Sequence, residues 1–413
     1  MALPAGLRAL AHRNFRLYFA GQAVSIIGSW IQQVALAWLV YRLTGSAALL
    51  GITAFCGLIP QLVVGPFAGA WIDKHDKKKW LIGVQSLMAL QAFVLAGLTW
   101  AGWITPGFII AMALLLGILS SFDAPLRQSL IGSFVGSRDD LPNALALNAM
   151  LFNSGRFIGP PIAGLLLGLT SEAFCFAING FSFLALIAAI LVVRSVPPAR
   201  ATGSVGEVFR EGLAYAWQTW SVRTLILTLI VLNLTASAYA VLLPVFAADV
   251  FAGDATTLGW LWGAAGCGAF ASTVFLATRH SVPGLIASVA SGTAIAAVSL
   301  LIFAATDWLP LAMVAMVGVG FGISVCNVGI NMILQSTAPE QLRGRIVSFF
   351  TSARFGFDAL GGLLAGFVAA GFGAGRTLMA EGIVLLVFVV FLFSRRQRLA
   401  EQVSIAQGNA HGH

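Results

Sequence analysis

Residues 283–305 read PGLIASVASGTAIAAVSLLIFAA, an apolar stretch of 23 residues without a charged side chain. A helix needs about 20 apolar residues to cross the hydrocarbon core of a bilayer. In a bilayer the backbone must bond within a helix or within a closed barrel, and barrel strands show alternating polarity. The apolar residues here are continuous, so this stretch predicts a transmembrane helix.

Stretches of the same character recur along the whole chain. Hydrophobic residues make up 59% of the 413 residues and charged residues only 9%, whereas a soluble domain carries about a quarter charged residues. Lipid is therefore the solvent for most of the surface. We predict an all-α membrane protein with twelve transmembrane helices, at residues 15–40, 46–70, 79–101, 106–125, 142–168, 172–193, 222–248, 256–278, 283–305, 308–331, 345–371 and 376–394.

The basic residues give the orientation of these helices. Arg156 and Arg354 lie within predicted spans, and Arg42 and Arg376 lie in loops that we place outside. The other lysines and arginines fall at the N-terminus, in the even-numbered loops and at the C-terminus. Basic residues favour the cytoplasmic side, so we expect a multi-pass protein of the bacterial inner membrane with both termini cytoplasmic. Topology explains the net charge of +8, and we expect no nucleic-acid partner.

A polar linker divides the chain into two similar halves. Residues 194–221 contain prolines, glycines and serines, followed by apolar residues at helical spacing beside charges. That pattern predicts an amphipathic helix on the membrane surface. We therefore expect a six-helix bundle at 1–193, the linker at 194–221, a second six-helix bundle at 222–398 and a disordered cytoplasmic tail at 399–413.

The two halves share sequence at nearly constant offsets, which indicates an internal repeat. Leu50-Gly51 matches Leu258-Gly259 at an offset of 208, and this offset places Ser25 on Asn233. Three further positions, Ser120, Asp123 and Arg127, correspond to Ser324, Asn327 and Asn331 at an offset of 204. Repeated halves favour a substrate site between them near the bilayer midplane.

The loop after the second span reads Gly69-Ala70-Trp71-Ile72-Asp73-Lys74-His75-Asp76-Lys77-Lys78. It resembles the signature Gly-x-x-x-Asp-[Arg/Lys]-x-Gly-[Arg/Lys]-[Arg/Lys] of the major facilitator superfamily, except that Asp76 stands where the family often has glycine. The resemblance implies two pseudo-symmetric six-helix bundles and a conformational gate. Its gating residues would be Gly69, Asp73, Lys74, Lys77 and Lys78, with Asp73 facing the start of span eleven near Gly344.

The fifth span reads Gly155-Arg156-Phe157-Ile158-Gly159-Pro160-Pro161-Ile162-Ala163-Gly164. It resembles the motif of the exporter branches, and Gly155, Gly159, Pro160 and Gly164 are the matching positions. The N-terminal pattern Arg13-Asn14-Phe15-Arg16, with Tyr18, Phe19, Gly21 and Gln22, looks like the branch of the enterobactin exporter and macrolide-efflux-like permeases. This resemblance implies export of a small amphipathic molecule, by a protein that is usually a monomer.

Polar side chains form stripes on three predicted spans. Steps of three and four residues place them on one helical face, and polar groups in a bilayer face either a wet cavity or a partner helix. As sets, the stripes favour a substrate cavity, whereas any one residue could instead bond between helices. The candidate cavity residues are Gln22, Ser25, Ser29, Gln32, Asn233, Tyr239, Asn327 and Asn331.

Few charges lie inside the spans, so each is a candidate for proton coupling. Arg354 and Asp358 are four residues apart on span eleven and can pair. Asp123 lies on span four, and Arg156 lies in span five without a local acid. We predict that Asp358, with Arg354, exchanges a proton during transport, with Asp123 as the second choice and Arg156 as a partner. The alternative is a permanent structural ion pair.

The sequence shows no sign of enzyme chemistry. It lacks a phosphate-binding loop of the Gly-x-x-x-x-Gly-Lys-[Ser/Thr] type, and its five histidines fall in loops and tails. We expect no catalytic residues, no cofactor and no metal. The predicted partners are a small molecule of the drug or siderophore class, protons and the lipid bilayer. Proton-coupled uptake of a small solute and a non-transporting membrane scaffold are the alternatives.

Overall fold

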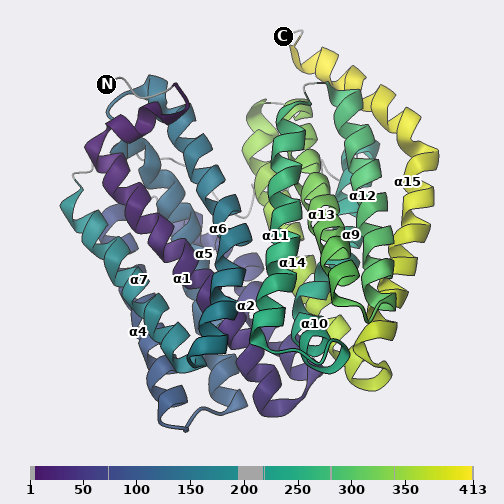
Figure 1. Ribbon diagram of the computed structural model, residues 1–413. Helices are drawn as coiled ribbons and strands as arrows, with labels where there is room; N and C mark the ends of the chain where they lie inside the picture. The colour runs from purple at the N-terminus through teal and green to yellow at the C-terminus, as the bar shows by residue number, and fades with distance from the viewer. Residues whose placement is uncertain are drawn as a thin grey trace.

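The computed structural model describes residues 5–72, 74–193, 217, 219–279, 281–338 and 340–411. These residues form one helical bundle made of two halves (Figure 1). The first half consists of η1 (Ala5–Ala11), α1 (Arg13–Thr44), α2 (Ala47–Val63), α3 (Gly65–Ile72), α4 (Lys77–Trp100), α5 (Pro106–Phe134), η2 (Arg138–Asp140), α6 (Leu141–Leu169) and α7 (Glu172–Val192). The second half consists of α9 (Trp220–Thr235), η3 (Ala236–Ala238), α10 (Tyr239–Val245), η4 (Phe246–Val250), α11 (Ala255–Ala277), α12 (Val282–Ala305), α13 (Leu309–Thr337), α14 (Glu340–Phe372) and α15 (Ala374–His411).

Ten described helices or continuous helical segments are long and apolar enough to cross a membrane. The second and fifth predicted spans complete the set of twelve. The second is shorter than the others because α2 has 17 residues, and the fifth, α6, is less apolar because Arg156 and several asparagines interrupt it. The predicted fold class is confirmed, since both helices occupy bundle positions equivalent to those of full spans.

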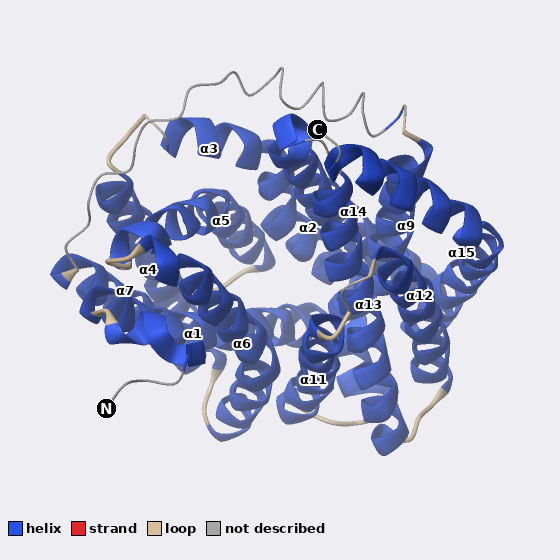
Figure 2. Ribbon diagram, turned by 90° about the horizontal axis from the view of Figure 1, so that it is seen from above, coloured by secondary structure: helices blue, strands red, loops and turns tan. Residues whose placement is uncertain are grey.

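The two halves repeat the same packing scheme. In the first half α1 packs on α6 and α7, α4 packs on α5 and α7, and α2 packs on α5. The second half has the matching pairs: α9 with α14 and α15, α12 with α13 and α15, and α11 with α13. Two equivalent pairs, α2 with α14 and α6 with α11, join the halves, as seen along the bundle in Figure 2.

The halves meet at the end of the bundle opposite the two termini, which we call the distal end (Figure 1). A Cβ on Gly51 of α2 would lie 2.8 Å from Gly362 O, and a Cβ on Gly366 of α14 would lie 2.6 Å from Ala47 O. The equivalent contact joins α6 and α11, where a Cβ on Gly164 would lie 2.9 Å from Ala255 O. Backbone therefore touches backbone at both joints, and glycine is the residue that permits it.

Two predicted segments differ in the structure. The second span, predicted at 46–70, is broken after Val63, where a turn at Val64 separates α2 from α3. The Gly65-Pro66 pair explains the break, because glycine is a poor helix former and Pro66 has no N–H to donate to the carbonyl of Leu62, four residues earlier. In the view along the bundle α3 is seen from its side, so it does not run parallel to the other helices (Figure 2).

The tail predicted to be disordered from residue 399 is helical as far as His411, as the end of α15. Leu399 and Val403 are four residues apart and both are buried in the hydrophobic core, so one face of this extension packs on the bundle. Arg398 adds a cation–π contact, its Cζ lying 4.7 Å from the ring centroid of Trp220 at the start of α9. The predicted amphipathic helix of the linker falls outside the described residues.

Replacing Gly164 with alanine should destabilise the protein, because the new Cβ meets the backbone of α11, which cannot move aside as a side chain can. Overpacking of this kind costs about 1–3 kcal/mol. Gly97 on α4 is the matched control, since a Cβ there meets nothing within 4 Å and alanine is the better helix former. Thermal unfolding of the purified protein should show a lower Tm for Gly164→Ala and an equal or higher Tm for Gly97→Ala.

Candidate transport site

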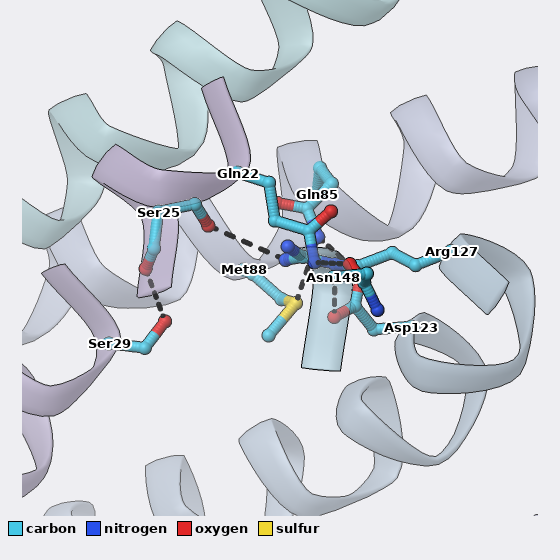
Figure 3. Close-up of polar contacts among 8 residues, drawn as sticks. All are labelled: Gln22, Ser25, Ser29, Gln85, Met88, Asp123, Arg127 and Asn148. Carbon is cyan, nitrogen blue, oxygen red and sulfur yellow. Dashed lines mark hydrogen bonds and ion pairs between the residues drawn. The ribbon is translucent and has the colours of Figure 1, made fainter. Parts of the chain in front are cut away.

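A buried polar cluster in the first half is built around an ion pair (Figure 3). Arg127 Nε lies 2.7 Å from a carboxylate oxygen of Asp123, one turn earlier on α5. Gln85 of α4 also donates to Asp123, and Arg127 Nη2 donates to Ser25 Oγ of α1 over 3.4 Å. The two charged side chains are only 7% and 13% exposed, so this pair holds three helices of one half together.

The polar stripe predicted on α1 is bonded to neighbouring helices of the same half. Gln22 Nε2 donates to Asn148 Oδ1 of α6 over 2.8 Å, and Ser29 Oγ donates back to the Ser25 carbonyl (Figure 3). One turn further on, Gln32 bonds to Gln91 of α4 and Asn179 of α7. Gln22, Ser25 and Gln32 are buried, so in this state their hydrogen bonds lie between helices.

The second half carries a neutral counterpart of the charged cluster. Asn233 Nδ2 of α9 donates to Asn327 Oδ1 of α13 over 3.2 Å, and Ser237 Oγ donates to Asn233 Oδ1 over 3.3 Å. Asn331, which matches Arg127 in the repeat, accepts from Gln335. The repeat thus keeps the contact between its first and fourth spans but replaces an ion pair with amides.

A second group of charges spans the interface between the halves. Arg156 comes from α6 of the first half, whereas Tyr239, Arg354 and Asp358 come from α10 and α14 of the second. Asp358 interacts electrostatically with both arginines, and Tyr239 interacts with Arg156 and Asp358. Each of these four residues lies in the middle part of its span, which is where a site between repeated halves is expected.

Asp358 is not locked to one arginine. Arg354 and Asp358 are four residues apart on α14 and interact electrostatically, but among the described ion pairs none joins them, and the Nε of Arg354 is buried without a hydrogen-bond partner. The predicted pairing on α14 is therefore looser than the pair formed by Asp123 and Arg127. A carboxyl group in this setting can change its partner or its protonation state.

The backbone of Arg156 contacts the other half in this state. A Cβ on Gly266 of α11 would lie 2.3 Å from Arg156 O, so α6 and α11 touch at this level. Because Arg156 and Asp358 belong to different halves, a rigid-body movement of one half changes the distance between their charges. The arrangement can thus couple the charge state of Asp358 to the relative position of the halves.

Comparison with known proteins gives the family. The family model of transmembrane secretion effectors in the major facilitator superfamily matches residues 5–411. The chain belongs to this superfamily. The multidrug efflux pump Tap of Mycolicibacterium fortuitum is 30% identical over 386 residues, covering 90% of this chain and 93% of Tap. The staphyloferrin A transporter of Staphylococcus aureus is 26% identical and covers 92% and 96%. Macrolide efflux protein A of Streptococcus pyogenes is 28% identical over 159 residues, 38% of this chain and 39% of that protein.

Solved structures support the same fold. A bacterial homologue of the lysosomal transporter Spinster, in an inward-facing and unoccupied conformation, has a TM-score of 0.70 at 13% identity, covering 94% of this chain and 98% of its own. The nucleoside transporter NupG has a TM-score of 0.68 at 15% identity, with 94% and 99% covered. The protein is a major facilitator transporter of the efflux branch and not an enzyme.

The major facilitator gating motif lies partly outside the described residues. Asp73 itself is not described, and for Gly69 and Gly344 the structure describes only the helical backbone. Lys74 is exposed, and Lys78 Nζ donates to the Val193 carbonyl over 2.5 Å at the end of α7. Asp76 accepts from Lys78 N and Lys79 N and so caps α4. Capping gives a physical reason for the departure from the family pattern at this residue.

The exporter motif on α6 packs two different helices at once. Cβ atoms on Gly155 and Gly159 would lie 2.2 Å and 2.5 Å from side-chain atoms of Ile26 and Trp30 on α1, within the same half. The other end of the motif faces the second half, where the Pro160 carbonyl and Gly164 contact Gly259 of α11. The motif therefore connects packing inside one half with the joint between the halves.

Several polar residues of these clusters were missed at the sequence level. Gln85 and Gln91 of α4, Asn148 of α6 and Asn179 of α7 are isolated amides in apolar runs, without the regular spacing that marked α1 and α13. An amide inside a span is itself a signal, because a polar group in hydrocarbon needs a partner. In the part of the chain that the structure describes, no three His, Cys, Asp or Glu side chains gather as a metal site would need.

Removing the carboxylate of Asp123 should destabilise the transporter, because Arg127 would remain charged and buried without its partner. Breaking a buried ion pair on one side costs about 3–5 kcal/mol. We expect a lower Tm for Asp123→Asn and partial recovery in the double variant Asp123→Asn/Arg127→Gln, measured by thermal unfolding in detergent. If the double variant were as unstable as the two single changes added together, the pair would not be the source of the loss.

Proposed function

We propose that the protein exports small amphipathic molecules, of the drug or siderophore class, from the cytoplasm by alternating access in exchange for protons. The match to transmembrane secretion effectors over residues 5–411 supports a transporter. The relatives reported above include a multidrug efflux pump, a staphyloferrin A transporter and a macrolide efflux protein, which supports this substrate class.

The observation that carries the proposal is the group of charges shared between the halves. Arg156 of the first half acts on Asp358 of the second. A nearby cation favours the ionised form of a carboxyl group, and burial favours the neutral form. When the halves rock so that Arg156 moves away, Asp358 takes up a proton from outside. When Arg156 returns, as in the present state, Asp358 releases the proton to the cytoplasm. Protons then run inward as substrate runs outward.

The orientation follows from the basic residues. We infer that both termini are cytoplasmic in the bacterial inner membrane, which makes the distal end the periplasmic side and the present state inward-facing. In this proposal the transporter works as a monomer, since both halves of the site are in one chain.

The remaining predicted site residues have supporting roles in the proposal. Gly69, Asp73, Lys74, Lys77 and Lys78 would close the cytoplasmic side, and the exporter motif at Gly155, Gly159, Pro160 and Gly164 would transmit movement between α1 and α11. The substrate would lie between the halves, beside Ser29 and Asn331. The other candidate cavity residues, Gln22, Ser25, Gln32, Asn233, Tyr239 and Asn327, are buried in this state and would reach the substrate only after the helices of their half rearrange.

Asp358→Asn should lose at least tenfold in efflux driven by a pH gradient, because asparagine cannot exchange a proton. The assay uses proteoliposomes with an imposed pH gradient and a fluorescent lipophilic dye such as Hoechst 33342. Glu381→Gln is the matched control: Glu381 is another carboxyl group inside a span, but its helix α15 packs on α9, α12, α13 and α14 of its own half. It should keep most of the wild-type rate.

Two outcomes would count against the proposal. Full gradient-driven efflux by Asp358→Asn would remove Asp358 from proton coupling. Movement of the dye in the same direction as the protons would favour the alternative of coupled uptake. Exchange of labelled for unlabelled dye without a gradient should survive in Asp358→Asn, which separates loss of coupling from loss of folding.

A further inference from the structure

Among the residues that the structure describes, one hydrogen bond between side chains joins the two halves at the distal end. Tyr41 Oη donates to Asp249 Oδ2 over 2.5 Å. Tyr41 lies in the last turn of α1, and Asp249 lies in η4 at the end of the first span of the second half. The bond therefore links the outer ends of the two spans that begin each half.

The two residues occupy equivalent positions in the repeat. The offset of 208 that relates Leu50-Gly51 to Leu258-Gly259 also relates Tyr41 to Asp249. Equivalent positions of two symmetric units can touch each other only beside the symmetry axis, as in any isologous contact. The bond thus lies on the pseudo-twofold axis of the transporter, at the distal end where the halves meet.

The backbone around Asp249 is built differently from that around Tyr41. Residues Phe246–Val250 form a π turn, in which Phe251 N donates to Phe246 O over 2.9 Å, and Gly253 N donates to Ala247 O over 2.8 Å. Ala252 follows with φ of 47°, a left-handed conformation, whereas the matching turn after α1 uses Gly45 with φ of 57°. π turns and left-handed residues other than glycine recur at functional sites.

We infer that the bond between Tyr41 and Asp249 is a latch that keeps the periplasmic side closed in the inward-facing state and breaks each time the transporter opens outward. This inference rests on the alternating access proposed above and adds the residues of the outer gate. The glycine joints at this end place backbone on backbone, and Thr256 Oγ1 of α11 donates to the Gly164 carbonyl of α6 over 3.3 Å. The latch adds a hydrogen bond to a carboxylate, which is stronger than a neutral one.

The neighbouring ion pair provides a matched control. Arg42 Nε lies 2.7 Å from Glu172 Oε1, one residue after Tyr41 and at the same end of the bundle. Both partners belong to the first half, so separation of the halves leaves this pair intact. Removing it should change the stability of the first half but not the balance between open and closed states.

The test measures the distance across the distal end in the full chain. Trp103 and Trp308, both strongly exposed, lie in the loops that join α4 to α5 and α12 to α13 at that end. The four native cysteines are replaced, and nitroxide labels are attached to new cysteines at these two positions. Pulsed electron–electron double resonance in nanodiscs then reports the distance between the labels, and so the opening of the distal end. Tyr41→Phe and Asp249→Leu each remove the hydrogen bond, so each should raise the ratio of long to short distances at least tenfold. Arg42→Gln should leave the ratio unchanged.

The double variant Tyr41→Phe/Asp249→Leu should open no further than either single variant, because the same bond is lost in each case. The latch is overturned if Tyr41→Phe and Asp249→Leu keep the wild-type distances, or if Arg42→Gln opens the distal end equally. The measurement needs neither substrate nor proton gradient, so its failure leaves the export proposal standing. Conversely, a negative result in the dye assay would leave the result of the distance measurement unchanged.

Discussion

The contact of backbone on backbone at the two joints is the constraint on which the rest of the structure depends. In lipid there is little hydrophobic force between helices, so helices associate where small residues allow close approach. Gly51 against Gly366 and Gly164 against Gly259 provide that approach at equivalent places. At these glycines no side chain lies between the two backbones, so the halves can tilt about these points while each bundle stays intact.

The distribution of polar groups follows from that division. Inside each half the polar side chains are bonded to one another, through an ion pair in the first half and through amides in the second. Between the halves, the charges of Arg156, Arg354 and Asp358 interact without forming a described ion pair. Satisfied groups make a bundle rigid, whereas a carboxyl group between two movable bodies responds to their movement. The protein thus places its adaptable charges at the interface between the halves.

Much of this organisation could be predicted from the sequence, because a bilayer leaves few choices for an apolar chain. Twelve spans, two halves and their equivalence follow from hydropathy, basic loops and the offsets between repeats. The features that could not be predicted depend on contacts between residues far apart in the sequence. Leu399 and Val403 lie in a polar segment of the sequence, and only the structure shows that they are buried. Gln85 is a single amide in an apolar stretch, and only the structure places it beside Asp123. The break at Val64 follows from Gly65-Pro66, which the hydropathy of the predicted span concealed.

The internal repeat explains why the hydrogen bond at the distal end joins two different residue types. Duplication puts equivalent residues next to each other only at the axis, and there the sequence has diverged to complementary groups, a phenol in one half and a carboxylate in the other. Identical residues could not form a charge-assisted bond of this type, since two carboxylates would repel and two phenols would lack the charge. Away from the axis, each residue meets a non-equivalent partner, and divergence there is set by packing within its own half. Asymmetry at the axis is therefore what a duplicated transporter needs to hold one side closed.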